Sequence, residues 1–228
     1  MRFKLIVVAA LAASWIAVAG AELSAESAAP AARDNVKGFE VEVREIEGKV
    51  RRRMTGSSWR PGCPVDREDL RLIRATHWDW GGHKDLGSIV VHEKEAGEIV
   101  RVFRSLFRQR FPIRRMELID RFGADDHRSM NADNTSGFNC RYVNGTTTWS
   151  QHAYGRAIDL NPIENPYVTP SGFVSPPAGE PYADRSRDSK GMVHRGDAAY
   201  RAFSQEGWKW GGNWSGSKDY QHFSENGR

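Results

Sequence analysis

A buried-strand pattern that contains one carboxylate places the strongest constraint on how this chain folds. Residues 157–160 read Ala-Ile-Asp-Leu, so the strand is apolar except for Asp159. Burying a carboxylate is costly unless the group is paired or bound to a metal. Six residues separate Asp159 from His152, and Gly155 between them supplies a turn. We therefore infer a turn followed by a buried strand, and Asp159 is the leading acid for a functional site.

A second motif, Asp-Tyr-Gln-His-Phe at residues 219–223, follows about sixty residues later. Together, His152, Asp159 and His222 form a set of zinc ligands. Catalytic zinc usually takes three protein ligands at about 2.0–2.2 Å and leaves a fourth position to water, whose pKa falls from about 15.7 to roughly 7. We predict that these residues bind zinc and that Asp219 is the base for the water. The alternative role for Asp219 is a turn cap.

Strand geometry constrains the second motif. Side chains three positions apart face opposite sides of a regular strand. Asp219 and His222 therefore cannot both point at one metal from such a strand. We expect Asp219 in the turn before the strand, or at a bulge that redirects its side chain.

The two motifs resemble the two boxes of the zinc peptidoglycan peptidases, a family of D-alanyl-D-alanine carboxypeptidases and L-alanyl-D-glutamate endopeptidases. Residues 150–159 match the first box and residues 219–222 match the second. The similarity extends over about residues 59–224. It is densest over residues 128–166 and 207–223, and both boxes occur in the family's order.

From this resemblance we expect an α+β fold in which helices pack on a small antiparallel sheet and zinc lies in a cleft on that sheet. The resemblance implies an exported zinc metallopeptidase whose partner is the peptide stem of peptidoglycan. A D-alanyl-D-alanine carboxypeptidase is our first expectation, and an L-alanyl-D-glutamate endopeptidase is the second. A zinc-bearing cell-wall binding module without activity is the remaining alternative, because hedgehog signalling domains share this metal-site architecture. The presence of Asp219 argues against that alternative.

The resemblance also implies substrate-binding residues. Related peptidases place a substrate-binding arginine where Arg128 stands, so we favour it, while Arg141 competes because it lies closer in sequence to His152. A guanidinium suits a peptide carboxylate or carbonyl because it offers a planar fork of donors. The alternative for either arginine is a solvated loop residue. Ser150 either binds substrate or shapes the turn. Asn213 stands where many relatives have an aspartate, so it is open whether this position supports the metal ligands through hydrogen bonds.

The N-terminus has the pattern of an export signal. Basic residues precede an apolar run over residues 5–19, and Ala19-Gly20-Ala21 is a small-residue cleavage site. We expect a signal peptide over residues 1–21, a disordered linker over residues 22–38, and a peptidase domain over residues 39–228. An uncleaved anchor is the alternative, but the apolar run is at the short limit for a bilayer span. We expect a secreted or cell-wall-associated protein without stable membrane insertion.

The charge balance is mild, with 33 basic and 29 acidic residues. Bases such as those at residues 51–53 are mixed with acids such as Glu45 and Glu47, so the chain has no basic stripe for nucleic acid. A weakly basic protein would still be attracted to an anionic cell wall. We expect a monomer that does not bind nucleic acid.

Cys63 and Cys140 are the two cysteines of the chain. In an exported protein, an even number predicts a disulfide. The loop would be long, and the chain-entropy model gives roughly 4–5 kcal/mol for it. The alternatives are two buried free thiols, or Cys140 as a nucleophile. A bridge at Cys140 would hold the loop that enters the first box.

Periodicity predicts the remaining elements. Alternation of apolar and polar residues predicts a strand over residues 39–43, and helical spacing predicts a helix over residues 94–110. Aromatic and β-branched residues on both sides of Gly81-Gly82 predict a hairpin over residues 76–92. The polar insert at residues 184–196 is expected to be either a mobile rim of the cleft or a surface loop. We also expect helices over residues 66–73 and 197–206, strands over residues 116–122, 208–210 and 220–223, and a long polar loop over residues 125–139.

Overall fold

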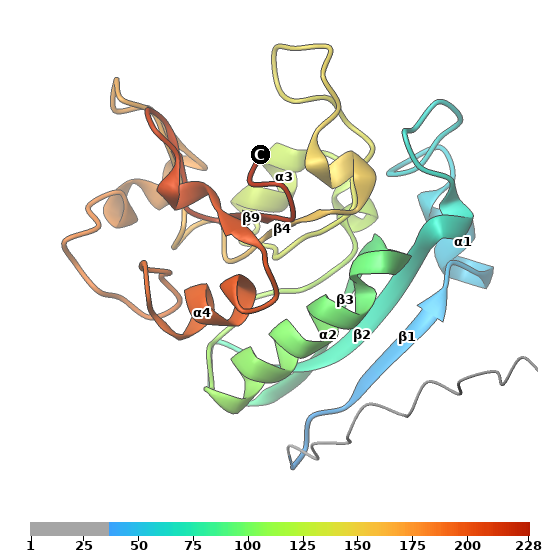
Figure 1. Ribbon diagram of the computed structural model, residues 1–228, viewed down its shortest axis with the longest axis horizontal. Helices are drawn as coiled ribbons and strands as arrows, with labels where there is room; N and C mark the ends of the chain where they lie inside the picture. Colours follow the sequence, from blue (N-terminus) through green and yellow to red (C-terminus); the bar gives the residue numbers. More distant parts are fainter. Residues whose placement is uncertain (1–36) are drawn as a thin grey trace, which may run out of the picture. The chain divides into compact units, whose positions relative to one another are not determined.

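The largest sheet is antiparallel and has the strand order β1-β2-β3 (Figure 1). The computed structural model describes residues 37–228, so the predicted signal peptide and most of the predicted linker lie outside the described residues. β2 and β3 pair along their full length, which confirms the predicted hairpin. β1 spans Val41–Glu45, β2 spans Leu70–Trp78 and β3 spans Lys84–His92.

Helix α2 (Glu93–Arg108) lies along one face of this sheet (Figure 1). Its apolar residues recur three or four positions apart, as predicted, and Ile99, Phe103 and Leu106 are buried. They belong to one core cluster with Ile73 and Ile89, which lie opposite each other in β2 and β3. Burying a side chain of this size contributes about 1.5–3 kcal/mol. The hairpin and α2 therefore form a stable base for the rest of the domain.

Two smaller antiparallel sheets carry the residues of the two sequence boxes. In the first, with order β4-β9-β7, Ile158 lies opposite Phe223, and both side chains join the core cluster of α2. The second has the order β6-β5-β8. The α+β class is therefore confirmed. The strands are β4 (Ala157–Asp159), β5 (Tyr167–Val168), β6 (Val174–Ser175), β7 (Lys209–Trp210), β8 (Lys218–Asp219) and β9 (His222–Ser224).

Two glycines allow the backbone before β4 to approach β3 closely. A Cβ atom on Gly137 would lie 2.4 Å from the backbone oxygen of Val90. A Cβ atom on Gly155 would lie 2.5 Å from the backbone nitrogen of His92, which donates a hydrogen bond to the Gly155 oxygen at 2.9 Å. Gly155 also has a φ of +67°, a left-handed conformation that favours glycine. The predicted turn is thus confirmed, and both contacts hold the first box against the large sheet.

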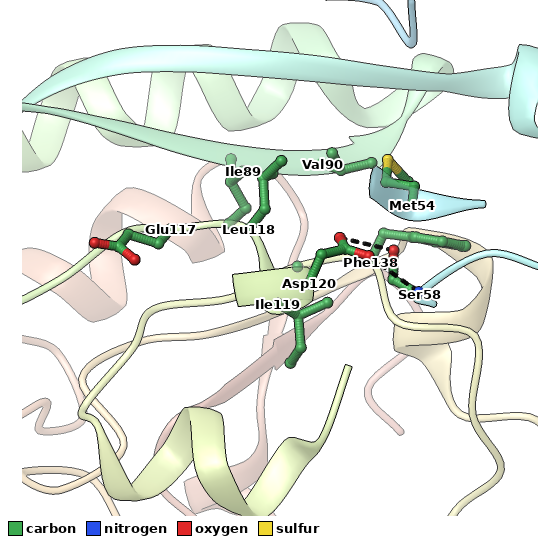
Figure 2. A pocket seen from close by; sticks show the side chains of 10 residues that line it. Met54, Ser58, Ile89, Val90, Glu117, Leu118, Ile119, Asp120 and Phe138 are labelled. Atoms are coloured by element: carbon green, nitrogen blue, oxygen red, sulfur yellow. Dashed lines mark hydrogen bonds between the residues drawn. The ribbon is translucent and has the colours of Figure 1, made fainter. Parts of the chain in front are cut away.

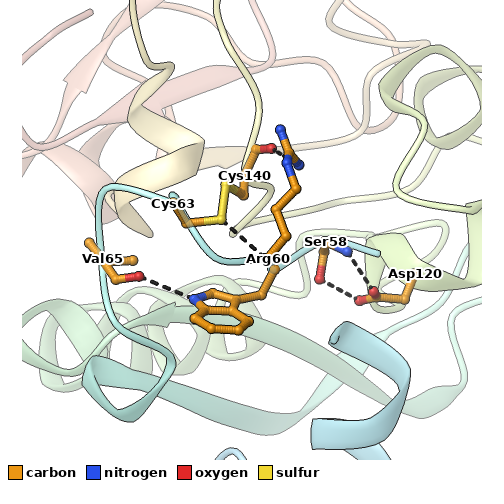
Figure 3. Close-up of a disulfide and its surroundings, with 7 residues drawn as sticks. Ser58, Arg60, Cys63, Val65, Asp120 and Cys140 are labelled. Atoms are coloured by element: carbon orange, nitrogen blue, oxygen red, sulfur yellow. Dashed lines mark hydrogen bonds between the residues drawn. A yellow bond between two sulfur atoms is a disulfide. The ribbon is translucent and has the colours of Figure 1, made fainter. Parts of the chain in front are cut away.

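The predicted disulfide between Cys63 and Cys140 is present (Figure 3), with Cα atoms 5.8 Å apart and a sequence separation of 77 residues. Arg60 strengthens the same junction, because its Nη1 donates to the Cys140 oxygen at 2.7 Å. The bridge ties the loop after α1 to the segment that leads into the first box. The alternatives of free thiols and of a nucleophilic Cys140 are therefore excluded.

A cavity of about 10 Å³ lies between β3 and the turn at residues 117–120 (Figure 2). Its walls include Met54 and Phe138, and the Asp120 carboxylate accepts hydrogen bonds from the Ser58 backbone N–H (3.1 Å) and hydroxyl (2.9 Å). This volume suits about one water molecule. The cavity is therefore a packing feature and not a binding site.

Two predicted elements are wrong. Residues 66–73 form only a short 3-10 helix (Arg67–Asp69) before β2 begins, because β2 pairs with a strand on each side. The expected strand at residues 116–122 is irregular and ends in the 3-10 helix Ile119–Phe122. Only one backbone bond, from Ser88 N–H to the Met116 oxygen at 2.7 Å, connects its start to β3.

The expected polar loop at residues 125–139 contains helix α3 (Asp126–Asn131), whose first turn is capped by the Asp125 side chain. The predicted cap at Asp197 is confirmed, since its carboxylate accepts from the Tyr200 N–H at 2.7 Å. Within residues 37–228, no helix is long and apolar enough to cross a membrane. The remaining helices are α1 (Gly48–Met54), α4 (Ala198–Ser204) and the 3-10 helices Gln151–Tyr154, Pro177–Tyr182 and Gly211–Asn213.

Candidate metal centre

The side chains of His152, Asp159 and His222 meet at one buried point. Asp159 ends β4 and lies opposite His222 at the start of β9, while His152 comes from the 3-10 helix before β4. His152 Nε2 lies 3.2 Å from Asp159 Oδ2, and His222 Nδ1 lies 3.1 Å from Asp159 Oδ1. The two histidine nitrogens are 3.3 Å apart. One atom from each side chain therefore faces a common position that could hold a metal ion.

The chemistry of this donor set fits zinc. Two imidazole nitrogens and a carboxylate oxygen are typical ligands of catalytic zinc, which leaves one position open. The other ring nitrogen of His152, Nδ1, lies 2.7 Å from the Gly137 backbone oxygen. A ligating histidine commonly donates its second N–H to such a carbonyl, which directs the opposite nitrogen toward the metal.

Electrostatic interactions within the cluster determine the protonation of its carboxylate. Burial acts to raise the pKa of Asp159, but the positive charges and hydrogen bonds of His152 and His222 outweigh burial and hold this pKa below its usual range. Burial acts to lower the pKa of His222, but its hydrogen bond and attraction to Asp159 raise it. Asp159 is therefore ionised, as a metal-binding carboxylate must be.

Asp219 lies beside this cluster but comes from a different sheet. It ends β8 and pairs with Tyr167 of β5, whereas His222 belongs to β9. The two residues therefore do not share a regular strand, as strand geometry required. The position of Asp219 differs in detail from our expectation, because it ends a separate short strand and does not lie in a turn or at a bulge of β9. Only long-range pairing with β5 creates that strand.

Asp219 is half-buried, and its buried Oδ1 has no hydrogen-bond partner among the described residues. Burial raises the pKa of Asp219 to about 6; the positive charge of His222 opposes this rise, and the negative charge of Asp159 adds to it. A carboxyl group with a pKa near neutrality can both take and return a proton. Asp219 is therefore well suited to general acid–base chemistry.

A cavity of about 420 Å³ opens onto the cluster, and its walls include His152, Asp159, Asp219 and His222. This volume lies within the usual range of about 300–1,000 Å³ for small-ligand sites. Val143 and Phe173, both exposed, lie on its walls. The candidate centre thus lies in a cleft with an apolar rim.

The structure separates the two arginines that the sequence left in competition. Arg141 lines the cavity, and its Nη2 lies 2.8 Å from Asp126 Oδ2. The Arg128 side chain is 75% exposed, pairs loosely with Asp125 and is not among the described residues that line the cavity. Ser150 does line the cavity, and its hydroxyl accepts from the His152 N–H at 3.3 Å. It therefore shapes the turn before His152.

Several cavity residues were not singled out from the sequence. Gln221 is buried between Asp219 and His222 in the second box, and that position was an available clue. Tyr167 and Arg228 also line the cavity, but they lie outside both boxes, so no local pattern marked them. The polar insert at residues 184–196 contributes no described residue to this cavity; it borders a separate, open hollow. The insert is therefore not the rim of the candidate site.

The comparisons agree with the geometry of the site. Residues 144–225 match the family described as D-alanyl-D-alanine carboxypeptidase. No curated protein and no solved structure matches the chain. The matched segment includes both boxes and all four residues of the cluster, and it supports a zinc peptidase that acts on peptidoglycan. The segment over residues 144–225 is thus similar to the zinc peptidases of the family described as D-alanyl-D-alanine carboxypeptidase.

Proposed function

We propose that this protein is an exported zinc peptidase that removes the terminal D-alanine from the peptide stem of peptidoglycan. The observation that carries the proposal is the buried group of His152, Asp159 and His222 beside an Asp219 oxygen that has no partner within residues 37–228. The family match supports this substrate class. The disulfide supports export, because such bridges form and persist in oxidising compartments.

The chain supplies ligands and a base for this reaction. Zinc held by His152, Asp159 and His222 would polarise the peptide carbonyl and lower the pKa of water. Asp219 then accepts the proton of the attacking water and passes it to the leaving amine, which its raised pKa permits. Because Asp219 lines the same cavity as the ligands, its carboxyl group would lie close to a scissile bond held there.

Arg141 is the residue we assign to the free carboxylate of the substrate. A guanidinium can form two charge-assisted hydrogen bonds with a carboxylate. Arg141 lines the cavity, and its Nε is buried without a partner among residues 37–228. A substrate carboxylate would have to share this guanidinium with Asp126, which already binds Nη2.

That ion pair favours the second candidate function, an L-alanyl-D-glutamate endopeptidase. An endopeptidase must leave room for chain on both sides of the scissile bond and does not need an uncompensated cation for a terminal carboxylate. Because Asp126 already neutralises Arg141, the cavity could accept an internal peptide.

Muropeptides incubated with the purified protein and analysed by mass distinguish these candidates. Loss of one terminal alanine supports the carboxypeptidase, and a cut nearer the sugar supports the endopeptidase. No change in a zinc-loaded protein would reject both and favour a binding module.

A matched substrate pair tests the role of the terminal carboxylate. For a carboxypeptidase, amidation of that group should lower kcat/KM by an amount equal to roughly 1.5–3 kcal/mol, the contribution of a hydrogen bond to a charged group. Equal cleavage of the free and amidated peptides would exclude our first candidate and favour the endopeptidase.

A further inference from the structure

The second ring nitrogen of His222 contacts a residue outside both sequence boxes. His222 Nδ1 faces Asp159 and His152, as described above, whereas its Nε2 lies 3.0 Å from the backbone oxygen of Arg228. A neutral imidazole carries a proton on only one of its nitrogens. A proton on Nε2, donated to Arg228, therefore leaves the Nδ1 lone pair free for a metal.

The second ring nitrogen of each histidine in the cluster thus faces a main-chain oxygen. His152 Nδ1 faces the Gly137 oxygen at 2.7 Å, and His222 Nε2 faces the Arg228 oxygen at 3.0 Å. Gly137 lies against β3, so its oxygen is held by the large sheet. Arg228 has no such neighbour in a sheet, and its position must come from local contacts.

Two hydrogen bonds connect the segment of residues 225–228, here called the tail segment, to the rest of the domain, and a third lies within it. Trp214 Nε1 donates to the Gly227 oxygen at 2.8 Å, and the Arg228 N–H donates to the Asn226 side-chain oxygen at 3.0 Å. The Glu225 N–H donates to a backbone oxygen at residue 156, just before β4, at 3.1 Å. Figure 1 shows the end of the chain near β4 and β9. The tail segment is therefore an organised turn beside the cluster.

Trp214 connects this turn directly to the ligand. Its ring lies 5.6 Å from the His222 ring, centroid to centroid, and it also lines the cavity. Gly227 has a φ of +85°, and a Cβ atom there would lie 2.9 Å from Lys209 Cδ. The path of the tail segment thus depends on the indole N–H of Trp214 and on a glycine at position 227.

We infer that the tail segment positions His222 for metal binding: the Arg228 oxygen accepts the Nε2 proton and so selects the tautomer that binds zinc through Nδ1. Trp214 and Gly227 hold that oxygen in place. The inference rests on the zinc site of the proposed function and adds positioning residues to it. Loss of such an outer contact typically weakens metal affinity about 10–100-fold.

Two variants displace the Arg228 oxygen by different means. Trp214→Phe removes the N–H that binds the Gly227 oxygen but keeps a ring beside His222. Gly227→Ala forces a side chain into a left-handed conformation and against Lys209. Gly207→Ala is the matched control, because Gly207 has nearly the same φ, +86°, and a Cβ atom there meets nothing within 4 Å. Competition with a chelator should show zinc binding about 10–100-fold weaker in the first two variants and unchanged in the control.

The tautomer of His222 gives a readout that general destabilisation does not change. In the metal-free protein, Arg228 and Asp159 compete for the single proton of a neutral His222 ring, and ¹⁵N shifts of the ring measure the fraction on Nε2. In both tail variants the proton should move toward Nδ1, where Asp159 accepts it at 3.1 Å in the present geometry. The His152 ring, which donates to Gly137, should keep its shifts and serves as an internal reference.

Weaker zinc binding together with the tautomer shift supports the inference. Wild-type zinc affinity and tautomer in both folded variants would overturn it while leaving the zinc site intact. Raised turnover with unchanged zinc affinity would also overturn it, because the tail segment would then only obstruct the cleft. If the wild-type protein binds no zinc, the proposed function fails as well, and the two failures are thereby distinguished.

Discussion

Asp219 combines a raised pKa with a buried Oδ1 that has no hydrogen-bond partner among the described residues. Replacing it with asparagine keeps the shape but removes the proton acceptor. Asp219→Asn should therefore keep wild-type zinc content and lose about 10²–10⁴-fold in kcat, the usual contribution of general acid–base catalysis. Glu164→Gln is the control, because Glu164 is another buried acid with a raised pKa and lies outside the cavity. Near-normal turnover of zinc-loaded Asp219→Asn would contradict the assignment.

Glu164 predicts a pH dependence of stability at the same scale. Burial raises its pKa to about 7 from the ordinary value of 4.5; nearby Asp133 adds to the rise, and Arg114, bound at 2.9 Å, opposes it. A carboxyl group whose pKa is higher in the folded state favours folding most at low pH. Its contribution is complete below about pH 4.5 and is lost as the pH rises through about 7.

The free energy of unfolding of the wild type, relative to Glu164→Gln, should therefore fall by on the order of 2–3 kcal/mol between these limits. Denaturant unfolding at a series of pH values measures this difference and cancels the titration of other groups. A constant difference between the two proteins would show that Glu164 titrates normally.

At the scale of elements, the close approach of the segment before β4 to β3 depends on Gly137. Gly137→Ala would place a Cβ atom 2.4 Å from the Val90 oxygen and 2.9 Å from Ile89 Cγ1. The backbone must shift, which should cost about 1–3 kcal/mol in unfolding free energy. Zinc affinity should also fall, because the Gly137 oxygen accepts from His152.

Gly97→Ala in α2 provides the contrast for this prediction. A Cβ atom there meets only Arg101 Nη1 at 3.5 Å, and alanine favours a helix interior over glycine by roughly 0.5–1 kcal/mol. This variant should be more stable, with unchanged zinc binding, in the same unfolding and titration experiments. A Gly137→Ala protein as stable as the wild type would show that the segment before β4 does not pack tightly against β3.

For the whole molecule, the Cys63–Cys140 bridge restricts the unfolded chain over a separation of 77 residues. A double variant, Cys63→Ala with Cys140→Ala, should lose about 2–5 kcal/mol of unfolding free energy. Its dependence on denaturant should become steeper, because an unbridged unfolded chain exposes more surface. The single variant Cys63→Ala also breaks the bridge, so its unfolded chain should lose the same restriction. Unchanged midpoint and slope in the double variant would mean that the bridge does not restrict the unfolded state.

The sequence by itself determined the parts whose pattern is local or covalent. Helical spacing determined α2, and strand-forming residues on both sides of a glycine pair determined the hairpin. An apolar stretch after a glycine turn determined β4, and the pair of cysteines left a single intramolecular disulfide. The spacing within each box predicted that His152, Asp159 and His222 act together as one group of metal ligands. These predictions succeeded because side-chain periodicity directly reflects which face of an element is buried.

Only the tertiary structure decided how distant segments meet. Pairing with β5 places Asp219 on its own strand, and the path of the backbone puts Arg141 in the cavity and leaves Arg128 in solvent. The contact between Arg228 and His222 leaves no mark on the local sequence, because a backbone oxygen is common to every residue. The segment at residues 116–122 was predicted as a strand, but within the described residues it has only one backbone hydrogen bond to β3. Strand pairing depends on partners far along the chain, and local propensity does not encode those partners.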